Sequence, residues 1–524
     1  MESDTRVLIA GGGVVGLSTA LFLAHQGIPS LVVERSPGTS SHPGFRGLNP
    51  RTMEAFRSVG VEADIWAVAG EQQRAGFVAR GRNLADPEIS WLELPWDGGT
   101  DALSPCDFCT CDQDRLEPVL VEQARRRGAT IRFGTELTIV EQDEDGVSAT
   151  LRDRAAGTKH RVRADYLVAA DGARGRTRDQ LGIGQTGPGV LEHRVNVMFT
   201  TDVPPVLQGR KLTSVLASDI NGSLVPRTES PWLMSVPYRP EDGESLADFT
   251  PERCLDLIRR GVGRADVAAS IEAVLPWRPA ALVADAFRGG RVFLAGDSAH
   301  VMPPAGAFGG NSGIHDAFNL AWKLAAVIDG TAGPALLDTY ETERKPVIER
   351  TIAEALRRMR AWFATPGGDT EPPEPLDDNT VIYGYRYPVL GQPDLYEDPR
   401  HPTVRPGSRA PHVWLRDGMR RLSTLDLFGR GHVLLCGPGT ADWHKAAARS
   451  GIPSHLVGPA GLSDEDGGWA ERYGDVAVLV RPDGFVVWRS DTPADISAAD
   501  PTGTLASVVA GIRAGVPAAG SASR

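Results

Sequence analysis

Arg6-Val-Leu-Ile-Ala10 runs directly into Gly11-Gly12-Gly13-Val14-Val15-Gly16, and apolar residues then recur at helical spacing over residues 14–26. The apolar run predicts a buried strand, and the spacing predicts the helix that follows it. A second apolar run, Leu31-Val-Val-Glu34, predicts the next strand. Strand, helix and strand make a βαβ unit, so the sequence predicts an α/β fold that opens a doubly wound parallel sheet.

The glycines of this loop have the spacing of a dinucleotide-binding turn. Gly11 permits the tight turn, Gly13 lets backbone amides approach a pyrophosphate, and Gly16 lets the helix pack close to the sheet. Glu34, at the end of the second strand, can accept hydrogen bonds from a ribose diol. The alternative is a glycine-rich turn without a ligand, and the motif alone does not separate NAD from FAD. The predicted cofactor-binding residues here are Gly11, Gly13, Val14, Val15, Gly16, Glu34 and Arg35.

A second glycine-rich segment covers residues 291–323 and contains Gly296-Asp297-Ser-Ala-His300-Val-Met-Pro303-Pro304. Asp297, after an apolar run, can accept a hydrogen bond from a sugar-like hydroxyl. The Gly-Gly-Asn sequence at 309–311 opens the next helix, whose dipole favours negative charge on a bound ring. The predicted cofactor-binding residues of this segment are Asp297, Pro304, Gly306, Gly309, Gly310 and Asn311.

A third motif, Tyr166-Leu-Val-Ala-Ala-Asp171-Gly172-Ala-Arg174, completes a pattern that resembles the single-component FAD-dependent aromatic hydroxylases. This family includes p-hydroxybenzoate hydroxylase, phenol hydroxylase and the tailoring hydroxylases of aromatic polyketides, and the resemblance spans about residues 5–360. It implies that Arg46 meets the cofactor, that Gln113 contacts the ribityl chain and that Asp171 lies near FAD and the pyridine nucleotide. The alternatives are that Arg46 is a surface cation and that Gln113 caps the helix that follows it.

Two positions depart from the family pattern. Gly175 stands where the family commonly has serine, and Phe308 stands where a polar residue is frequent. Neither change removes a group that the chemistry requires. Both leave open how the reduced pyridine nucleotide docks.

The resemblance also implies the reaction. NADPH or NADH reduces FAD, O2 adds at flavin C4a, and the resulting hydroperoxide attacks an activated aromatic ring. We therefore expect a flavin-dependent monooxygenase that hydroxylates a phenolic or polycyclic aromatic molecule in bacterial secondary metabolism, such as antibiotic biosynthesis. Baeyer–Villiger or other oxidation on the same fold, and a non-catalytic flavin-binding scaffold or chaperone, are the alternatives.

The protein's own catalytic groups are harder to identify, because the cofactor carries the chemistry. Ser298, His300 and Asp297 do not make a convincing triad, since nearly adjacent residues leaving a strand point in different directions. A base that deprotonates a phenol would be a His or Tyr of the inserted β-rich region. The candidates are Tyr238, His193 and Arg194.

The chain reads as several domains. Short segments rich in Trp, Pro and Thr interrupt the α/β pattern twice, and they suit an apolar ligand. We predict a discontinuous FAD-binding domain made of residues 1–75, 105–189 and 285–364. We predict a β-rich substrate domain made of residues 76–104 and 190–284. A helix rich in Glu, Arg and Ala is predicted over about 334–364.

Beyond that helix, Thr365-Pro-Gly-Gly-Asp-Thr-Glu-Pro-Pro-Glu-Pro375 breaks all periodicity, so we predict a linker over 365–394. Residues 395–524 hold buried-strand candidates at 433–436, 476–480 and 485–488. They resemble the thioredoxin-like C-terminal domain of phenol hydroxylase and several polyketide hydroxylases. Cys436 has no Cys-x-x-Cys partner there, so we expect a structural or oligomerisation role.

Composition excludes other classes of protein. The 524 residues carry 55 basic and 67 acidic side chains, a net charge of −12, without a basic run, so nucleic-acid binding is not expected. Neither a signal peptide nor an apolar run long enough to span a membrane is apparent, and we expect a cytoplasmic monomer or homodimer. The Cys106-x-x-Cys109-x-Cys111 cluster lacks a second ligand pair, so we expect reduced structural thiols and no metal.

Overall fold

The computed structural model describes residues 3–41, 44–69, 77–92, 102–227, 231–363, 374–389, 394–464, 466–490 and 500–514. The chain divides into two compact units. The first comprises residues 1–69, 100–186 and 283–524, and the second comprises residues 70–99 and 187–282. Within the described residues, none of the helices combines the length and hydropathy needed to cross a bilayer.

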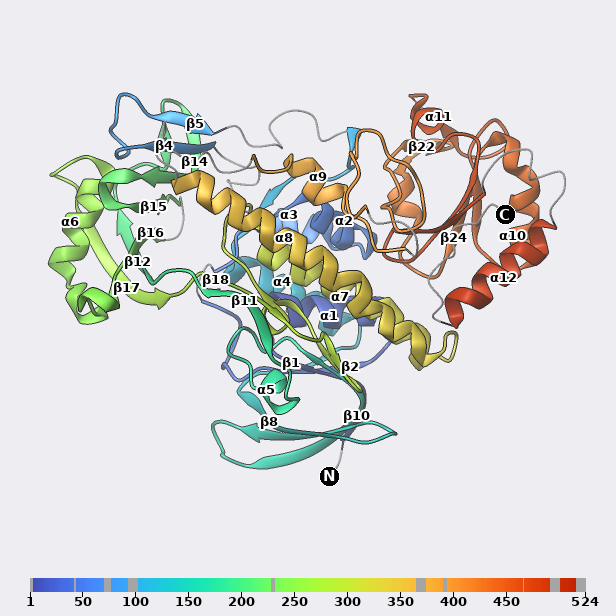
Figure 1. Ribbon diagram of the computed structural model, residues 1–524, viewed down its shortest axis with the longest axis horizontal. Coiled ribbons are helices and arrows are strands. Elements are labelled where there is room, and N and C mark those ends of the chain that lie inside the picture. The colour runs from blue at the N-terminus through green and yellow to red at the C-terminus, as the bar shows by residue number, and fades with distance from the viewer. Residues whose placement is uncertain are drawn as a thin grey trace. The chain divides into compact units, whose positions relative to one another are not determined.

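The largest sheet of the first unit is mostly parallel and doubly wound (Figure 1). Its strands β20, β10, β1, β2 and β7 lie side by side in that order and are parallel. β2 is buried along its whole length, as expected of a parallel strand covered on both faces. The bounds are β1 (Ser3–Ala10), β2 (Ser30–Val33), β7 (Thr130–Arg132), β10 (Lys159–Ala169) and β20 (Val292–Leu294). The fold class predicted from the sequence is confirmed.

Antiparallel strands extend this sheet. β9 (Val147–Asp153) pairs with β10 and with β8 (Thr135–Gln142), and β19 (Arg288–Gly289) pairs with β20. The helix α1 (Val14–His25) contacts both α4 (Gln113–Arg126) and α7 (Phe308–Ile328). β3 (Gly47–Leu48), which precedes α2 (Pro50–Ser58) and α3 (Glu62–Val68), forms a short antiparallel ladder with β6 (Cys109–Thr110).

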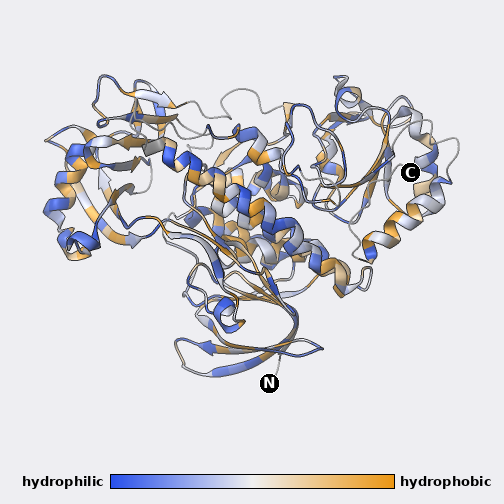
Figure 2. Ribbon diagram, in the orientation of Figure 1, coloured by the Kyte–Doolittle hydropathy of each residue, from blue (hydrophilic) through white to orange (hydrophobic). Residues whose placement is uncertain are grey.

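The helix expected over 334–364 consists of two elements. A 3-10 helix, η7 (Pro334–Asp338), is followed by α8 (Thr339–Phe363). η7 buries Leu336 and Leu337 within a single tight turn, a geometry that helical periodicity does not reveal. Hydrophilic and hydrophobic residues alternate along α8, as expected of a helix with one buried side (Figure 2).

Residues 395–524 belong to the same compact unit as the mostly parallel sheet. β24 (Val433–Cys436) and β25 (Ser454–Leu456) are parallel and are connected through α10 (Ala441–Arg449). β27 (Ala477–Val480) and β28 (Val486–Arg489) then add antiparallel strands, and α12 (Pro501–Arg513) follows. This order of elements is thioredoxin-like. β22 (Trp414–Asp417), β23 (Arg420–Ser423) and β26 (Ser463–Asp464) form a separate small sheet.

The stretch expected to be a linker, 365–394, is partly packed structure. It contains α9 (Asp378–Tyr383), and Tyr383, Tyr385 and Tyr387 are buried. These tyrosines pack against residues of distant elements such as Phe485, so only the tertiary structure reveals their burial. Residues 364–373 and 390–393 lie outside the described residues.

The second unit is a twisted sheet with one covering helix. Its strands follow the order β17-β12-β16-β15-β14-β4-β5, with β13 paired to β14. α6 (Pro251–Val262) begins where Thr250 accepts a hydrogen bond from the amide of Arg253 and ends at Gly263. The bounds are β4 (Phe77–Gly81), β5 (Ser90–Leu92), β12 (Arg194–Thr201), β13 (Val206–Leu207), β14 (Arg210–Ala217), β15 (Gly222–Val225), β16 (Trp232–Pro237) and β17 (Ala269–Trp277).

Candidate functional site

The glycine loop lies at the carboxyl end of β1 and tolerates no side chain at two positions. Gly11 has a φ of +104°, and a Cβ there would lie 2.1 Å from the carbonyl oxygen of Ala170. A Cβ on Gly16 would lie 2.0 Å from the carbonyl oxygen of Gly11. Both distances are far below van der Waals contact. The loop therefore holds the first turn of α1 close against the sheet, with its amides at the strand ends.

Glu34 lies directly beside this loop. We expect Glu34 to be the last residue of the second strand. The strand β2 ends at Val33, however, so Glu34 is the first residue after it. Its carboxylate accepts hydrogen bonds from the amides of Gly12 (2.7 Å) and Ser36 (2.7 Å). The remaining lone pairs of the carboxylate can accept from a ribose. A cleft at these strand ends is lined by residues that include Gly11, Glu34, Arg35, Asp171, Arg174 and Arg176.

Gln113 begins α4, and both polar atoms of its side chain are bonded to neighbours. Its Oε1 accepts from the amide of Phe45 (3.0 Å), and its Nε2 donates to Oε1 of Glu117 (2.6 Å). The other oxygen of Glu117 accepts from the amide of Ser40 (2.7 Å). Burial raises the pKa of Glu117, and nearby Glu34 adds to the rise. We had not singled out Glu117, although its position one turn after Gln113 places it on the same helix face.

Arg46 immediately precedes β3 in the chain and lies beside the residues that precede α4. Its carbonyl oxygen accepts from the amide of Cys111 (2.9 Å), which ties the segment to the chain before α4. Its Nε lies 3.4 Å from Oδ1 of Asp112, and the two side chains are 14% and 13% exposed. Arg46 is thus a largely buried cation that is paired with Asp112.

The Gly-Asp segment follows β20 as the short 3-10 helix η6 (Gly296–Ser298). Asp297 reaches solvent, but the surrounding protein desolvates its carboxyl and raises its pKa. His300 Nε2 donates to Asp316 at 2.6 Å, and Arg344 donates to the same carboxylate at 2.8 Å. The amide of Gly296 is bonded to Asp316 as well (3.1 Å). Asp316 and Arg344, which we had not assigned a role, therefore fix the segment from beneath.

The loop before α7 is shaped by positive φ angles. Gly306 has a φ of +87°, and Ala307, a residue with a side chain, has a φ of +55°. α7 begins at Phe308, one residue before the glycines expected to open it. The amides of its first turn have no acceptor within the helix, so they are available to an anionic or carbonyl group. Pro304 is exposed in this loop.

Phe308, one of the departures from the family pattern, is a buried packing residue. Its ring would lie 2.3 Å from a Cβ on Gly306, and the guanidinium of Arg358 stacks over it at 5.0 Å from the ring centroid. A Cβ on Gly309 would make ordinary contact with Met302 at 3.6 Å, whereas the ring of Phe45 covers Gly310, where a Cβ would meet it at 2.3 Å. The first turn of α7 thus needs a small residue at position 310.

Asn311 uses its side chain to hold the Arg46 segment. Its Oδ1 accepts from the amide of Asn49 (3.0 Å). Its Nδ2 donates to the carbonyl oxygens of Gly47 (2.8 Å) and Ala307 (2.7 Å). The side chain is buried. Asn311 therefore joins the start of α7 to β3 through its side chain.

The carboxyl group of Asp171 occupies the space that a side chain at Gly175 would need. Asp171 accepts from the hydroxyls of Thr177 (2.8 Å) and Ser298 (2.9 Å). A Cβ on Gly175 would lie 2.2 Å from the carboxyl carbon of Asp171, so serine does not fit this backbone. Ser298 is bonded to Asp171 while His300 is bonded to Asp316, so these residues do not form a triad.

The candidate bases lie in the second unit. The rings of His193 and Tyr238 meet edge to face at 5.7 Å, and the amide of Tyr238 donates to the carbonyl of His193 (3.0 Å). Both side chains are half-buried. Arg194 is buried and donates to Ser235 and Glu192, which gives it a structural function in the sheet.

All five cysteines are free and buried. Burial raises the pKa of the Cys109 thiol, and it raises that of Cys111 to about 12. In the part of the chain that the structure describes, His, Cys, Asp and Glu side chains do not gather into a group of three that could hold a metal ion. The cysteines are therefore inert packing residues at neutral pH.

These features fit FAD. The glycine loop leaves room for backbone amides to approach a pyrophosphate, Glu34 is anchored where a ribose would lie, and the first turn of α7 offers amides to a ring. Asp297 adds a carboxyl group beside that turn.

Comparison with known proteins identifies two regions. The FAD binding domain family matches residues 4–355, and the aromatic-ring hydroxylase C-terminal family matches residues 403–511. A putative polyketide hydroxylase of Streptomyces halstedii is 44% identical over an alignment of 530 residues that covers 95% of this chain and 95% of its own. The aklavinone 12-hydroxylase of Streptomyces purpurascens is 41% identical and covers 97% of this chain and 98% of its own.

A solved structure shares the whole architecture. The ternary complex of aklavinone-11 hydroxylase with FAD and aklavinone superimposes with a TM-score of 0.90 at 39% sequence identity. The match covers 98% of this chain and 99% of the other.

Proposed function

This chain belongs to the FAD-dependent aromatic-ring hydroxylases, and from that premise we propose that it hydroxylates a polycyclic phenolic molecule of bacterial polyketide metabolism. It is a flavin-dependent monooxygenase. The relatives named for polyketides and for aklavinone support the substrate class.

The residues have the following roles in the proposal. Glu34 holds the ribose, and the amides of the glycine loop and the first turn of α1 hold the diphosphate. Gln113 and Arg46 contact the flavin side of the cofactor, together with Asp297. The first-turn amides of α7 stabilise negative charge on the reduced ring. When bound, FAD supplies the chemistry by which NADPH or NADH and O2 deliver one oxygen atom to an aromatic ring.

The observation that carries the proposal is the convergence of separated segments on one edge of the sheet. The glycine loop follows β1, Glu34 follows β2, Asp171 follows β10 and Asp297 follows β20. Open α/β sheets bind ligands outside the carboxyl ends of their strands. Tyr238 and His193 remain candidate bases for a phenol in this proposal.

The test follows the visible absorbance of the purified protein. NADPH is added without air, then air is admitted with and without a phenolic polycycle. A yellow protein that bleaches, recovers in air and yields a product with one added oxygen supports the proposal. NMR of the product separates ring hydroxylation from Baeyer–Villiger insertion. A colourless protein that FAD does not reconstitute would overturn it.

A further inference from the structure

The helix that follows the Arg46 segment carries buried polar side chains. α2 is nine residues long and starts at Pro50, yet the side chains of Arg51, Thr52 and Glu54 are all buried. Charged side chains are rarely buried without partners. Each of the three is in fact bonded to another part of the first unit.

The amino end of α2 is bonded to the flavin segment, residues 45–49, and to α7. Asn49 caps the helix by accepting from the amide of Thr52 at 2.9 Å. The amide of Asn49 donates to Asn311, and the hydroxyl of Thr52 lies 3.0 Å from Nε2 of His315. A change in the position of α2 is therefore passed directly to the flavin segment.

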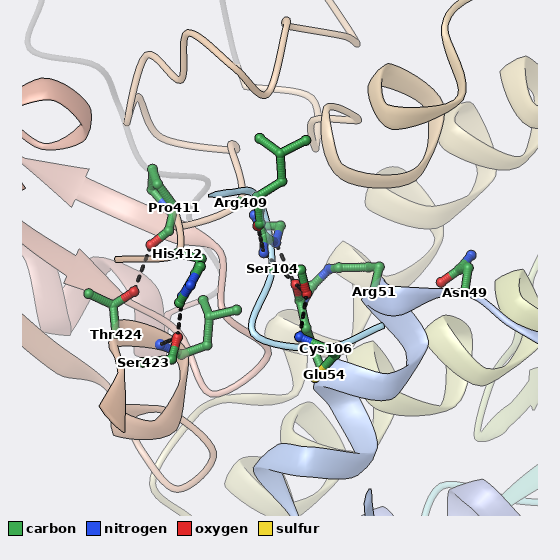
Figure 3. Close-up of polar contacts among 12 residues, drawn as sticks. Asn49, Arg51, Glu54, Ser104, Cys106, Arg409, Pro411, His412, Ser423 and Thr424 are labelled. Atoms are coloured by element: carbon green, nitrogen blue, oxygen red, sulfur yellow. Dashed lines mark hydrogen bonds and ion pairs between the residues drawn. The ribbon is translucent and has the colours of Figure 1, made fainter. Parts of the chain in front are cut away.

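The other side of α2 is bonded to the C-terminal part, residues 395–514. Figure 3 shows Glu54 between Arg51, Ser104 and Arg409. Oε2 of Glu54 accepts from Arg51 (2.9 Å) and from Nε of Arg409 (3.1 Å). Oε1 accepts from the hydroxyl of Ser104 (2.7 Å) and from Nη2 of Arg409. The guanidinium of Arg409 thus grips the carboxylate with two donors, the fork geometry that lysine does not reproduce.

The charges of this cluster are held in place by further contacts. Burial alone would raise the pKa of Glu54, but Arg409 and Arg51 outweigh it and lower the pKa. Arg409 also donates to the carbonyl oxygen of Leu103 (2.9 Å) and stacks over the ring of Tyr383. Arg51 donates to the carbonyl oxygen of Asp483 (3.0 Å). The C-terminal part therefore supplies a side chain and a carbonyl group to the base of α2.

We propose that Arg409 is a positioning residue for flavin binding. Acting through Glu54 and α2, it fixes the flavin segment in the place from which Arg46 meets the cofactor. The C-terminal part then has a function in the reaction besides packing, although it lies outside the dinucleotide fold. The inference rests on the proposed function, because it presumes that FAD binds beside residues 45–49.

The matched control is a second ion pair between α2 and the C-terminal part. Arg57, at the far end of α2, donates to Asp426 at 2.7 Å. Arg57→Gln breaks this contact without touching the cap, Asn311 or the Glu54 cluster. If the C-terminal part merely stabilises the fold, Arg57→Gln and Arg409→Met have the same kind of effect.

The experiment titrates each apoprotein with FAD and follows flavin fluorescence and the visible spectrum, below the unfolding temperature of every variant. We expect Arg409→Met to raise the FAD Kd by about tenfold or more and to shift the bound-flavin spectrum, because supporting contacts commonly tune a site by such factors. Arg57→Gln should lower the melting temperature but leave the Kd within about twofold of the parent. Arg409→Lys, which keeps the charge and loses the fork, should lie between them.

Equal Kd values and spectra for Arg409→Met, Arg57→Gln and the parent would overturn the proposal, even if both variants are less stable. If Arg409→Met does not fold, Ser104→Ala and Arg409→Lys take its place. Ser104→Ala removes one donor from Glu54 and should weaken FAD binding in the same direction. An unchanged Kd in both would be decisive against a positioning role. Failure of the parent protein itself to bind FAD would instead contradict the proposed function.

Discussion

One methyl group at residue 16 is enough to close the dinucleotide loop. A Cβ there meets the carbonyl oxygen of Gly11 at 2.0 Å, which is backbone and cannot swing aside. We expect Gly16→Ala to push α1 away from β1 and to weaken FAD binding by at least roughly 100-fold, as misplacement by about 1 Å does in other sites. The absorbance of the purified protein and a fluorescence titration with FAD measure the effect.

Gly511 supplies the control for this substitution. It lies within α12, and a Cβ there has no neighbour within 4 Å. Gly511→Ala should stabilise the protein by about 0.5–1 kcal/mol, because alanine loses less entropy in a helix. FAD binding should not change. Normal FAD affinity in Gly16→Ala would show that the loop relaxes and that the packing argument is wrong.

Asn311 is irreplaceable at the residue scale because it both accepts and donates. Asn311→Asp keeps the acceptor for the amide of Asn49 but turns a carboxylate oxygen toward the carbonyl of Gly47. We expect a loss of about 2–3 kcal/mol in the free energy of unfolding, from the lost bonds and from repulsion between oxygens. Urea denaturation measures it. Asn221→Asp, at an exposed turn with positive φ, should change stability by less than about 0.5 kcal/mol. A loss of similar size there would refute the argument.

Some site residues were recognisable in the sequence and others were not. Gly11, Gly16 and Glu34 follow one another in a short stretch with fixed spacing, so local pattern is sufficient to find them. Asp316 and Arg344 are 28 residues apart, and their bond appears only when α7 packs on α8. In the sequence, a buried charge looks the same as a solvated one. The cofactor roles of the predicted residues remain predictions.

At the scale of elements, α4 contains a proline that its fold does not need. Pro118 lies inside the helix and is exposed. Proline there removes a hydrogen bond and crowds the carbonyl of Asp114. We expect Pro118→Ala to raise the free energy of unfolding by about 1–2 kcal/mol, less than the full helix penalty because the helix has already adapted. Thermal unfolding tests this, and a lower melting temperature would mean that the proline itself supports Gln113 or Glu117.

Element boundaries show where sequence patterns end. The strands β1, β2 and β24 were predicted to within a few residues, because continuous apolar runs bury both faces. The helix before residue 364 was predicted as one piece, although η7 and α8 are distinct. α9 was missed, since polar residues and prolines around it mimic a linker. The buried tyrosine of α9, Tyr383, stacks against Arg409, which comes from another part of the chain.

At the scale of the whole molecule, a second buried ionic cluster joins the helices α7 and α8 to the C-terminal part, residues 395–514. Glu343 of α8 accepts from Lys323 of α7 (2.7 Å) and from both terminal nitrogens of Arg481 (2.6 and 2.9 Å). Arg481 is also bonded to Asp483. Together with the Glu54 cluster, it adds ionic contacts to the apolar packing of α8 against Phe485. A cluster of this kind makes the assembly sensitive to pH.

The sign of this sensitivity follows from Glu343. Burial alone would raise its pKa, but Arg481 and Lys323 outweigh burial and lower the pKa from 4.5 to about 2. A carboxyl group with a lowered pKa in the folded state contributes stability above its unfolded pKa, and the contribution is lost as pH falls toward the folded value. The loss therefore falls between about pH 4.5 and pH 2. We expect it to be on the order of 3 kcal/mol.

Glu343→Gln isolates this contribution. At neutral pH the variant leaves Lys323 and Arg481 without their shared anion, so it should be less stable than the parent by about 3 kcal/mol. As pH falls from 5 toward 2 the parent loses the same interaction, and the difference between the two should shrink. Glu349→Gln, on an exposed part of α8, should follow the parent at every pH. Urea denaturation at a series of pH values gives the three curves. A difference that stays constant over this range would show that Glu343 does not titrate with acid unfolding and that another carboxylate holds the two parts together.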